Sequence, residues 1–191
     1  MEKIKKMDLD RSQVPFRRSY WVEQGKLLAG AYPGSADPAV TARNMRRLVD
    51  FGIRRIVNLL EESEEAFYAE YLTPYQEELS RIAGQQGISP SISRYPIADM
   101  DVPSSRMMRD ILDEIDNSIV ANHPVFVHCA GGRGRTGTVI GCYLVRHGRS
   151  GSEALNRINE LRRHVPTANE PSPETRAQRD MVRNWQETGS R

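Results

Sequence analysis

The stretch of the chain that most restricts its fold is residues 125–147. It opens with a short β-branched and aromatic run from Val125 to His128, passes through a loop with three glycines, and ends in an apolar segment from Thr136 to His147. A buried strand, a glycine-rich loop and a helix in this order are typical of an α/β sheet. Glycines let a loop turn its backbone N–H groups inward, so we expect an anion to bind at the N-terminus of this helix.

The rest of the chain alternates strands and helices in the same way. Apolar runs and helical periodicity predict strands at 26–31, 53–60, 91–97 and 125–128, and helices at 37–52, 63–87 (broken near 73–74), 103–121, 136–147, 150–163 and from Ser172-Pro173 onward. Strands that alternate with helices usually pair in parallel and are covered on both faces. We therefore predict an α/β fold, a single domain with a mostly parallel central sheet flanked by helices.

Length and charge restrict the kind of protein. The 191 residues suit one domain, which we expect at residues 20–191, whereas residues 1–19 lack periodicity and are predicted to form an arm outside the core. The 27 basic and 25 acidic side chains give a net charge of +2, too small to indicate nucleic-acid binding. No apolar run approaches the roughly 18 residues of a membrane span. The N-terminus has no signal-peptide pattern, so a cytoplasmic protein is expected, and a monomer is assumed.

The glycine-rich loop carries a cysteine and an arginine separated by five residues. With this spacing the loop can wrap around a tetrahedral oxyanion, and Arg135 can bind two of the oxygens in bidentate fashion. The positive surroundings favour the thiolate form of Cys129, which is the nucleophilic form. The residues expected to surround a phosphate are Ala130, Gly131, Gly132, Arg133, Gly134 and Arg135.

The loop motif is specific once its neighbours are included. A bare Cys-x5-Arg spacing arises by chance in roughly one chain in four of this composition, but the added His, two Gly and Thr reduce the chance to roughly three in a million. The motif HCAGGRGRT resembles the phosphate-binding loop of the cysteine-dependent protein tyrosine and dual-specificity phosphatase superfamily. Residues 21–34, 52–59, 95–103 and 135–148 also resemble small microbial members. The resemblance implies a dual-specificity phosphatase fold and the hydrolysis of phosphomonoesters.

The resemblance also implies a general acid on a loop before the cysteine. Asp99 lies 30 residues before Cys129, and Asp101 lies 28 residues before it. The sequence YPIAD at 95–99 is similar to the family's acid loop and favours Asp99, whereas Asp101 suits the start of the following helix, where the dipole favours a carboxylate. In the implied reaction Cys129 attacks phosphorus to form phosphocysteine. Asp99 first protonates the leaving oxygen and then activates water.

Three further residues have supporting roles in the implied reaction, each with a plainer alternative. His128 either orients Cys129 and its loop through a hydrogen bond or is a structural histidine. Thr136 either donates a hydrogen bond to the thiolate or simply begins the helix. Gln178 shares the apolar face of the last helix and either positions the hydrolytic water or is a buried, hydrogen-bonded glutamine. The chemistry needs no metal or cofactor, and no ligand spacing predicts one.

Two other features have structural interpretations. Cys142 lies within a predicted helix and is expected to be a small buried residue, although some relatives protect the nucleophile through a disulfide with a second cysteine. Glu61, Glu62, Glu64 and Glu65 form a run of charge that is expected to be a solvated face.

The sequence indicates the substrate only in part. Inositol-lipid phosphatases of the resembled superfamily often carry basic residues directly after the cysteine and at the fourth loop position. Arg133 matches the second position, and Ala130 departs from the first. We expect phosphoproteins, with phosphotyrosine first and phosphoserine or phosphothreonine open, and inositol phosphates or another small phosphometabolite as the alternative. A non-catalytic phosphate-binding module is a third hypothesis, but it would require neither Cys129 nor Asp99.

Overall fold

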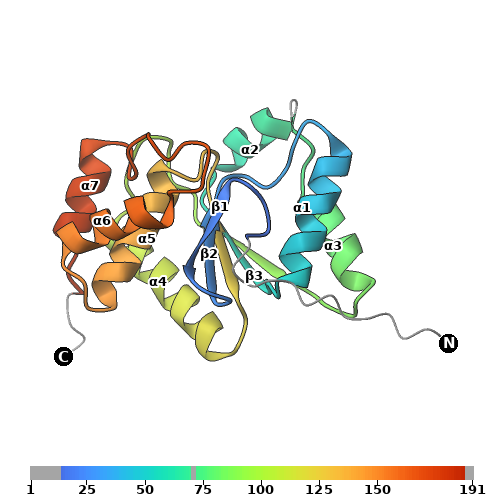
Figure 1. Cartoon of the computed structure of the whole chain (residues 1–191), viewed down its shortest axis with the longest axis horizontal. Helices are drawn as coiled ribbons and strands as arrows, with labels where there is room; N and C mark the ends of the chain where they lie inside the picture. The colour runs from blue at the N-terminus through green and yellow to red at the C-terminus, as the bar shows by residue number, and fades with distance from the viewer. Residues whose placement is uncertain (1–13, 70–71, 188–191) are drawn as a thin grey trace.

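The computed structural model describes residues 14–69 and 72–187 and has a five-stranded sheet at its centre (Figure 1). The order across the sheet is β1-β2-β5-β3-β4, and β1 pairs antiparallel with β2 while the other neighbours pair in parallel. The predicted α/β fold with a mostly parallel sheet is therefore confirmed. The strands are β1 (Ser19–Glu23), β2 (Leu27–Gly30), β3 (Arg55–Asn58), β4 (Ser91–Arg94) and β5 (Val125–His128).

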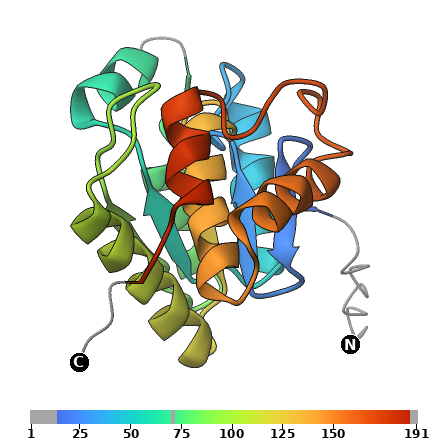
Figure 2. The same ribbon diagram turned by 90° about the vertical axis from the view of Figure 1, so that its left-hand side faces the viewer.

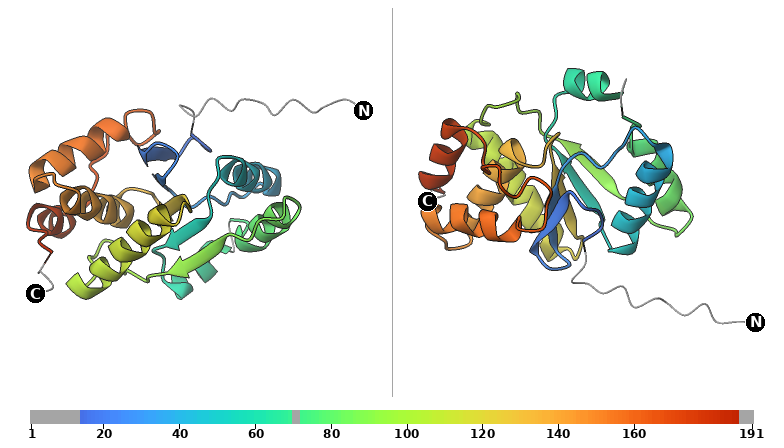
Figure 3. Two further views of the ribbon diagram at one scale, coloured as in Figure 1. Left: turned by 90° about the horizontal axis from the view of Figure 1, so that it is seen from below. Right: turned by 45° about the horizontal axis from the view of Figure 1, so that its top comes forward.

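The helices lie in two layers, one on each face of the sheet (Figures 1 and 2). One layer holds α1 (Pro38–Asp50) and α3 (Gln76–Gly84), and the other holds α4 (Ser105–Val120), α5 (Gly134–Arg146), α6 (Gly151–Leu161) and α7 (Arg176–Arg183). α2 (Glu62–Ala69) stands apart from both layers, beyond the edge of the sheet at which the chain leaves β3 (Figure 3). Over residues 14–69 and 72–187, no helix has both the length and the hydropathy needed to cross a membrane.

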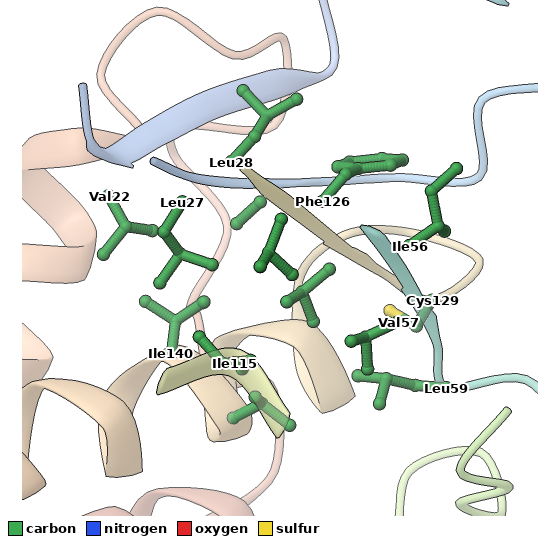
Figure 4. Packing of buried hydrophobic residues seen from close by; sticks show 14 of the residues in the cluster. Val22, Leu27, Leu28, Ile56, Val57, Leu59, Ile115, Phe126, Cys129 and Ile140 are labelled. Atoms are coloured by element: carbon green, nitrogen blue, oxygen red, sulfur yellow. The ribbon is translucent and has the colours of Figure 1, made fainter. Parts of the chain in front are cut away.

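The central strand β5 brings three chain segments together at one edge of the sheet. All four of its residues are buried, and its register pairs His128 with Gly30 of β2 and with Asn58 of β3. The three parallel strands therefore end at the same level, so the residues that follow them meet there. Cys129 follows β5 directly and lies in the hydrophobic core, beside Val57 and Leu59 in Figure 4.

Residues 14–19, the last part of the predicted N-terminal arm, contact the rest of the domain. The rings of Phe16 and Phe126 meet edge to face with their centres 5.7 Å apart. Arg47 Nη2 donates a hydrogen bond to the carbonyl oxygen of Val14 at 2.9 Å, and β1 begins at Ser19. Residues 1–13 of the predicted arm lie outside the described residues.

The start of the last helix corrects the sequence analysis. The sequence pattern places this start at Ser172-Pro173, whereas α7 begins at Arg176. Thr175 is the N-cap, because its side chain and that of Gln178 form a capping box. The Ser172 hydroxyl instead donates a hydrogen bond to a backbone carbonyl of the glycine-rich loop, and it is therefore not the helix cap.

Candidate active site

The glycine-rich loop connects β5 to α5 and packs against the end of β2. The backbone N–H of Tyr32 donates to the carbonyl oxygen of Ala130 at 3.0 Å. Gly132 has a φ of +70°, and a Cβ at this position would collide with the backbone of Gly30. A glycine is therefore required there by both the backbone angle and the available space. The chain enters α5 at Gly134, so the free N–H groups of the first helical turn lie at the loop.

Cys129 lies at the base of the loop, and only 2% of it is exposed. The fully buried His128 precedes it, with Nδ1 3.3 Å from the Cys129 carbonyl oxygen and Nε2 2.8 Å from the hydroxyl oxygen of Tyr75. Burial, opposed by the hydrogen bond to the Cys129 backbone and aided by the charges of Arg94 and Arg135, lowers the pKa of His128 to about 3. The imidazole is thus neutral at neutral pH. The arrangement fits a ring that donates from Nδ1 to the Cys129 carbonyl and accepts at Nε2 from the tyrosine.

Arg135 is buried beneath the loop and is held by groups from two other segments. Its Nη1 donates to Glu64 Oε2 at 2.5 Å and to the carbonyl oxygen of Ile97 at 3.0 Å, and its Nη2 donates to Glu64 Oε1 at 2.7 Å. Asp99 Oδ1 lies 3.0 Å from the same Nη2. Burial alone would lower the pKa of Arg135, but the hydrogen bonds to Glu64 and the surrounding negative charges outweigh it and raise the pKa. The guanidinium group is therefore a permanent cation.

One donor of Arg135 is not used by the protein. Its Nε is buried and has no hydrogen-bond partner among the residues that the structure describes. An unpaired buried donor destabilises the protein by about 1–3 kcal/mol, and more for a charged group, so such a donor usually has a functional reason. The geometry is suited to an anionic ligand that supplies the missing acceptor.

Of the two candidate acids, Asp99 reaches the arginine and Asp101 does not. The Asp99 side chain is 66% exposed, so its carboxylate is accessible to solvent while it pairs with Arg135. The carboxylate of Asp101 instead accepts from the backbone N–H of Val102 at 2.8 Å. Asp101 is also not the cap of α4, because Ser104 fills that position. The two aspartates lie at similar distances before Cys129 in the sequence, but in the structure they have different contacts.

Gln178 and Thr136 lie beside the loop and hydrogen-bond to the backbone. Gln178 is fully buried; its Oε1 accepts from two backbone N–H groups at the start of α7, and its Nε2 donates to the carbonyl oxygen of Asp101 at 3.1 Å. It thereby joins α7 to the segment that carries Asp99 and Asp101. Thr136 Oγ1 donates to the carbonyl oxygen of Gly30 at 3.4 Å. A water-positioning role for Gln178 and a thiolate contact of Thr136 stay predictions.

The side chain of Arg133, a predicted phosphate-binding residue, contacts acidic residues of another segment. It forms ion pairs with Glu170 and Glu174, both from the segment between α6 and α7. Its backbone carbonyl accepts a hydrogen bond from Ser172 Oγ at 2.8 Å, which holds the same segment against the loop. Because two carboxylates neutralise the guanidinium group, Arg133 does not offer a free charge to a phosphate in this arrangement.

Sequence analysis missed Glu64 and Glu65, and the expected solvated face is wrong for both. Glu64 holds Arg135, and Glu65 is buried and pairs with Arg94. The partners are distant along the chain, 71 residues for Glu64 and 29 for Glu65. No local pattern distinguishes these two glutamates from the exposed Glu62 beside them. The available signal was indirect, because buried arginines require carboxylate partners.

The second cysteine and the possible metal ligands add no further catalytic group. Cys129 and Cys142 are both free thiols, and burial raises the pKa of Cys142, with the charge of Glu187 adding to the effect. Within the described residues, no three His, Cys, Asp or Glu side chains gather as a metal site requires. The loop and the segment that carries Asp99 together bring a buried thiol, a permanent cation, a helix N-terminus and an accessible carboxylate to one place. These groups can bind a tetrahedral anion, attack it and protonate a leaving oxygen.

Fold and loop together define the class of protein, the cysteine-dependent tyrosine and dual-specificity phosphatases. The crystal structure of Tk-PTP in its active form has the same fold, with a TM-score of 0.64 at 23% identity over 87% of this chain and 95% of that chain. The chain belongs to the family described as "Polymorphic toxin system, DSP-PTPase phosphatase", which matches residues 32–149.

Two curated relatives share shorter stretches with the chain. The Arabidopsis thaliana protein named phosphatidylinositol 3,4,5-trisphosphate 3-phosphatase and protein-tyrosine-phosphatase PTEN1 is 32% identical over 96 residues, 49% of this chain and 22% of that protein. The Mus musculus dual specificity protein phosphatase CDC14B is 41% identical over 51 residues, 27% of this chain and 10% of that protein. The chain therefore spans less than a quarter of either relative.

Proposed function

We propose that the chain hydrolyses phosphomonoesters through a phosphocysteine intermediate, with Cys129 as the nucleophile, Arg135 as the phosphate-binding cation and Asp99 as the general acid. One observation carries the proposal. Arg135, buried next to the loop that starts at Cys129, lies 3.0 Å from Asp99 and keeps a buried donor without a protein partner. Membership of a phosphatase family supports the same reaction class.

The ion pair between Asp99 and Arg135 links substrate binding to proton transfer. A phosphate that enters the loop would accept hydrogen bonds from the Nε and Nη2 atoms of Arg135, and it would compete with the Asp99 carboxylate for Nη2. In the proposed reaction Asp99 supplies a proton to the departing oxygen. The proton is needed at this point, because attack by the Cys129 sulfur leaves negative charge on the departing oxygen.

Phosphotyrosine in proteins is the substrate class that we propose, with phosphoserine and phosphothreonine open. The ion pairs of Arg133 with Glu170 and Glu174 support this choice, because they neutralise one of the two basic positions expected for an inositol-phosphate enzyme, and Ala130 fills the other. An inositol phosphate is the alternative substrate. The name of the Arabidopsis relative includes both a phosphoinositide phosphatase and a protein-tyrosine phosphatase, so it supports either substrate class. A cytoplasmic location, a monomeric state and the boundary between arm and domain stay predictions.

The test is hydrolysis of p-nitrophenyl phosphate in the presence of EDTA. We expect Cys129→Ser to abolish turnover, because serine at this position is a much weaker nucleophile. We expect Asp99→Asn to lower kcat about 100-fold or more, within the range of general acid catalysis, and to remove the basic limb of the pH profile. Asp101→Asn is the matched control and should behave like the wild type.

Two outcomes would contradict the proposal. A folded wild-type protein that is no faster than Cys129→Ser would favour the phosphate-binding module instead. An Asp101→Asn variant that loses the basic limb while Asp99→Asn keeps it would move the general acid to Asp101.

A further inference from the structure

A cleft of about 880 Å³ opens beside the glycine-rich loop, where Ala130 and Gly131 form its border. Most of the other lining residues come from the segment that precedes β1 and from α1. The proposed reaction uses none of their side chains. The cleft therefore adjoins the phosphate site. At this position it can contact the part of a substrate that lies outside the loop.

The charge in the cleft has a single sign. Four arginines line it, Arg17 and Arg18 from the segment before β1 and Arg43 and Arg47 from α1, and no Asp or Glu does. Within the described part of the chain, no carboxylate forms an ion pair with any of the four, and the first three are exposed. At the loop, by contrast, carboxylates neutralise the arginines. Four cations that have no carboxylate partner among the described residues concentrate positive potential and attract an anionic ligand.

Arg47 is the most firmly placed of these arginines. Its Nη2 donates to the carbonyl oxygen of Val14, and its guanidinium carbon lies 5.5 Å from the centre of the Phe51 ring. Its Nε is buried and has no hydrogen-bond partner among the described residues. Such a donor is costly unless an acceptor reaches it, so this wall of the cleft has unused hydrogen-bonding capacity.

Apolar side chains complete the cleft and connect it to the catalytic groups. Phe16, Leu72 and Tyr68 lie in its wall. Tyr68 is close enough to the active site to be affected by its charges, because its pKa is raised by burial and then by the charges of Glu64 and Asp99. A surface that combines arginines with aromatic and aliphatic side chains suits a peptide, which offers both carboxylates and hydrocarbon, better than a bare polyphosphate.

Building on the proposed phosphatase activity, we propose that this cleft binds acidic residues next to the phosphotyrosine of a peptide substrate. Arg17, Arg18, Arg43 and Arg47 are then specificity-determining residues, which pair with Asp or Glu side chains of the substrate. The phosphotyrosine itself enters the loop at Cys129, and the flanking residues lie in the cleft.

The experiment uses two phosphotyrosine peptides that differ only in the replacement of three flanking Glu residues by Gln. Two quantities are compared at low and high salt: kcat/KM with the wild-type chain, and affinity by fluorescence anisotropy with Cys129→Ser, which does not depend on turnover. We expect both to favour the acidic peptide about tenfold at low salt, as three exposed ion pairs of about 0.5 kcal/mol each would give. The preference should shrink at high salt, because exposed charges are screened.

The variants locate the effect in the cleft. The triple variant Arg17→Gln, Arg18→Gln, Arg43→Gln should lower the preference to about twofold or less, since the exposed pairs are removed. Arg46→Gln is the matched control, because Arg46 is exposed on the same helix and does not line the cleft. It should keep the full preference.

The remaining outcomes distinguish failure of the cleft proposal from failure of the phosphatase proposal. If wild type and Cys129→Ser treat the two peptides alike, the cleft proposal is overturned, whether or not p-nitrophenyl phosphate is hydrolysed. A preference in affinity without any turnover would support the cleft and contradict the phosphatase proposal. A soluble inositol polyphosphate that binds more tightly than the acidic peptide, and loses this advantage in the triple variant, would overturn the peptide assignment.

Discussion

Two carboxylates, Glu64 and Asp99, contact the guanidinium group of Arg135. The sequence predicted a role in the reaction for Asp99 but not for Glu64. Glu64 takes two hydrogen bonds from the guanidinium group, at 2.5 and 2.7 Å, and leaves Nε for a ligand. It touches no reacting atom in the proposed reaction. Its part is to hold the arginine in the orientation that a tetrahedral anion needs.

We predict that Glu64→Gln lowers kcat/KM for p-nitrophenyl phosphate about 10- to 100-fold, the equivalent of the roughly 1.5–3 kcal/mol of a hydrogen bond to a charged group. Affinity for vanadate, measured by inhibition, should fall with it, which loss of fold stability alone would not cause. Glu62→Gln, an exposed neighbour on α2, is the control and should change neither value. Unchanged vanadate affinity in Glu64→Gln would show that Arg135 is oriented without this carboxylate.

The sequence predicted the site residues that lie close together along the chain. His128, Cys129 and Arg135 belong to one short motif that runs from the end of β5 to the start of α5, and Asp99 lies in a sequence similar to the family's acid loop. Glu64 and Tyr68 on α2 reach the site only through the fold, and their neighbours in sequence give no sign of it. The distance along the chain between partners, rather than the strength of their contact, decided what could be predicted.

At the scale of elements, two arginines fix the segment between α6 and α7, and only Arg133 belongs to the glycine-rich loop. Arg133 pairs with Glu170 and Glu174, and Arg162 donates to the backbone carbonyls of Thr167 and Glu170. Hydrophobic periodicity predicted the helices on either side of this segment. The Ser172-Pro173 pattern gave the wrong start for α7, because the Ser172 hydroxyl hydrogen-bonds to the glycine-rich loop and the capping box forms at Thr175.

We predict that the double variant Glu170→Gln, Glu174→Gln frees the charge of Arg133 for a substrate with a second phosphate. The ratio of kcat/KM for a soluble inositol polyphosphate to that for p-nitrophenyl phosphate should rise about two- to fivefold, the equivalent of a partly exposed ion pair. Glu160→Gln, which alters an exposed ion pair with Arg157, is the control. An unchanged ratio would mean that Arg133 takes no part in substrate choice even when released.

At the scale of the whole molecule, the sheet brings the site together, and His128 lies at the point where it does so. It ends β5, pairs with β2 and β3, and contacts the ring of Phe126 and the hydroxyl of Tyr75. The same burial that supports the loop also keeps the imidazole neutral. The free energy of unfolding therefore depends on pH through the protonation of His128.

The last prediction follows from that linkage. The pKa of His128 is about 3 in the folded chain, against an ordinary value near 6.5 in the unfolded chain. Between these values the unfolded state binds a proton that the folded state does not, so stability falls as the pH falls, by up to about 1.4 kcal/mol per pH unit. Urea unfolding at several pH values within this window should show a steeper slope for the wild type than for His128→Gln, by about one proton. His123→Gln, at an exposed position, should keep the wild-type slope. Equal slopes for wild type and His128→Gln would mean that His128 is protonated within the folded protein.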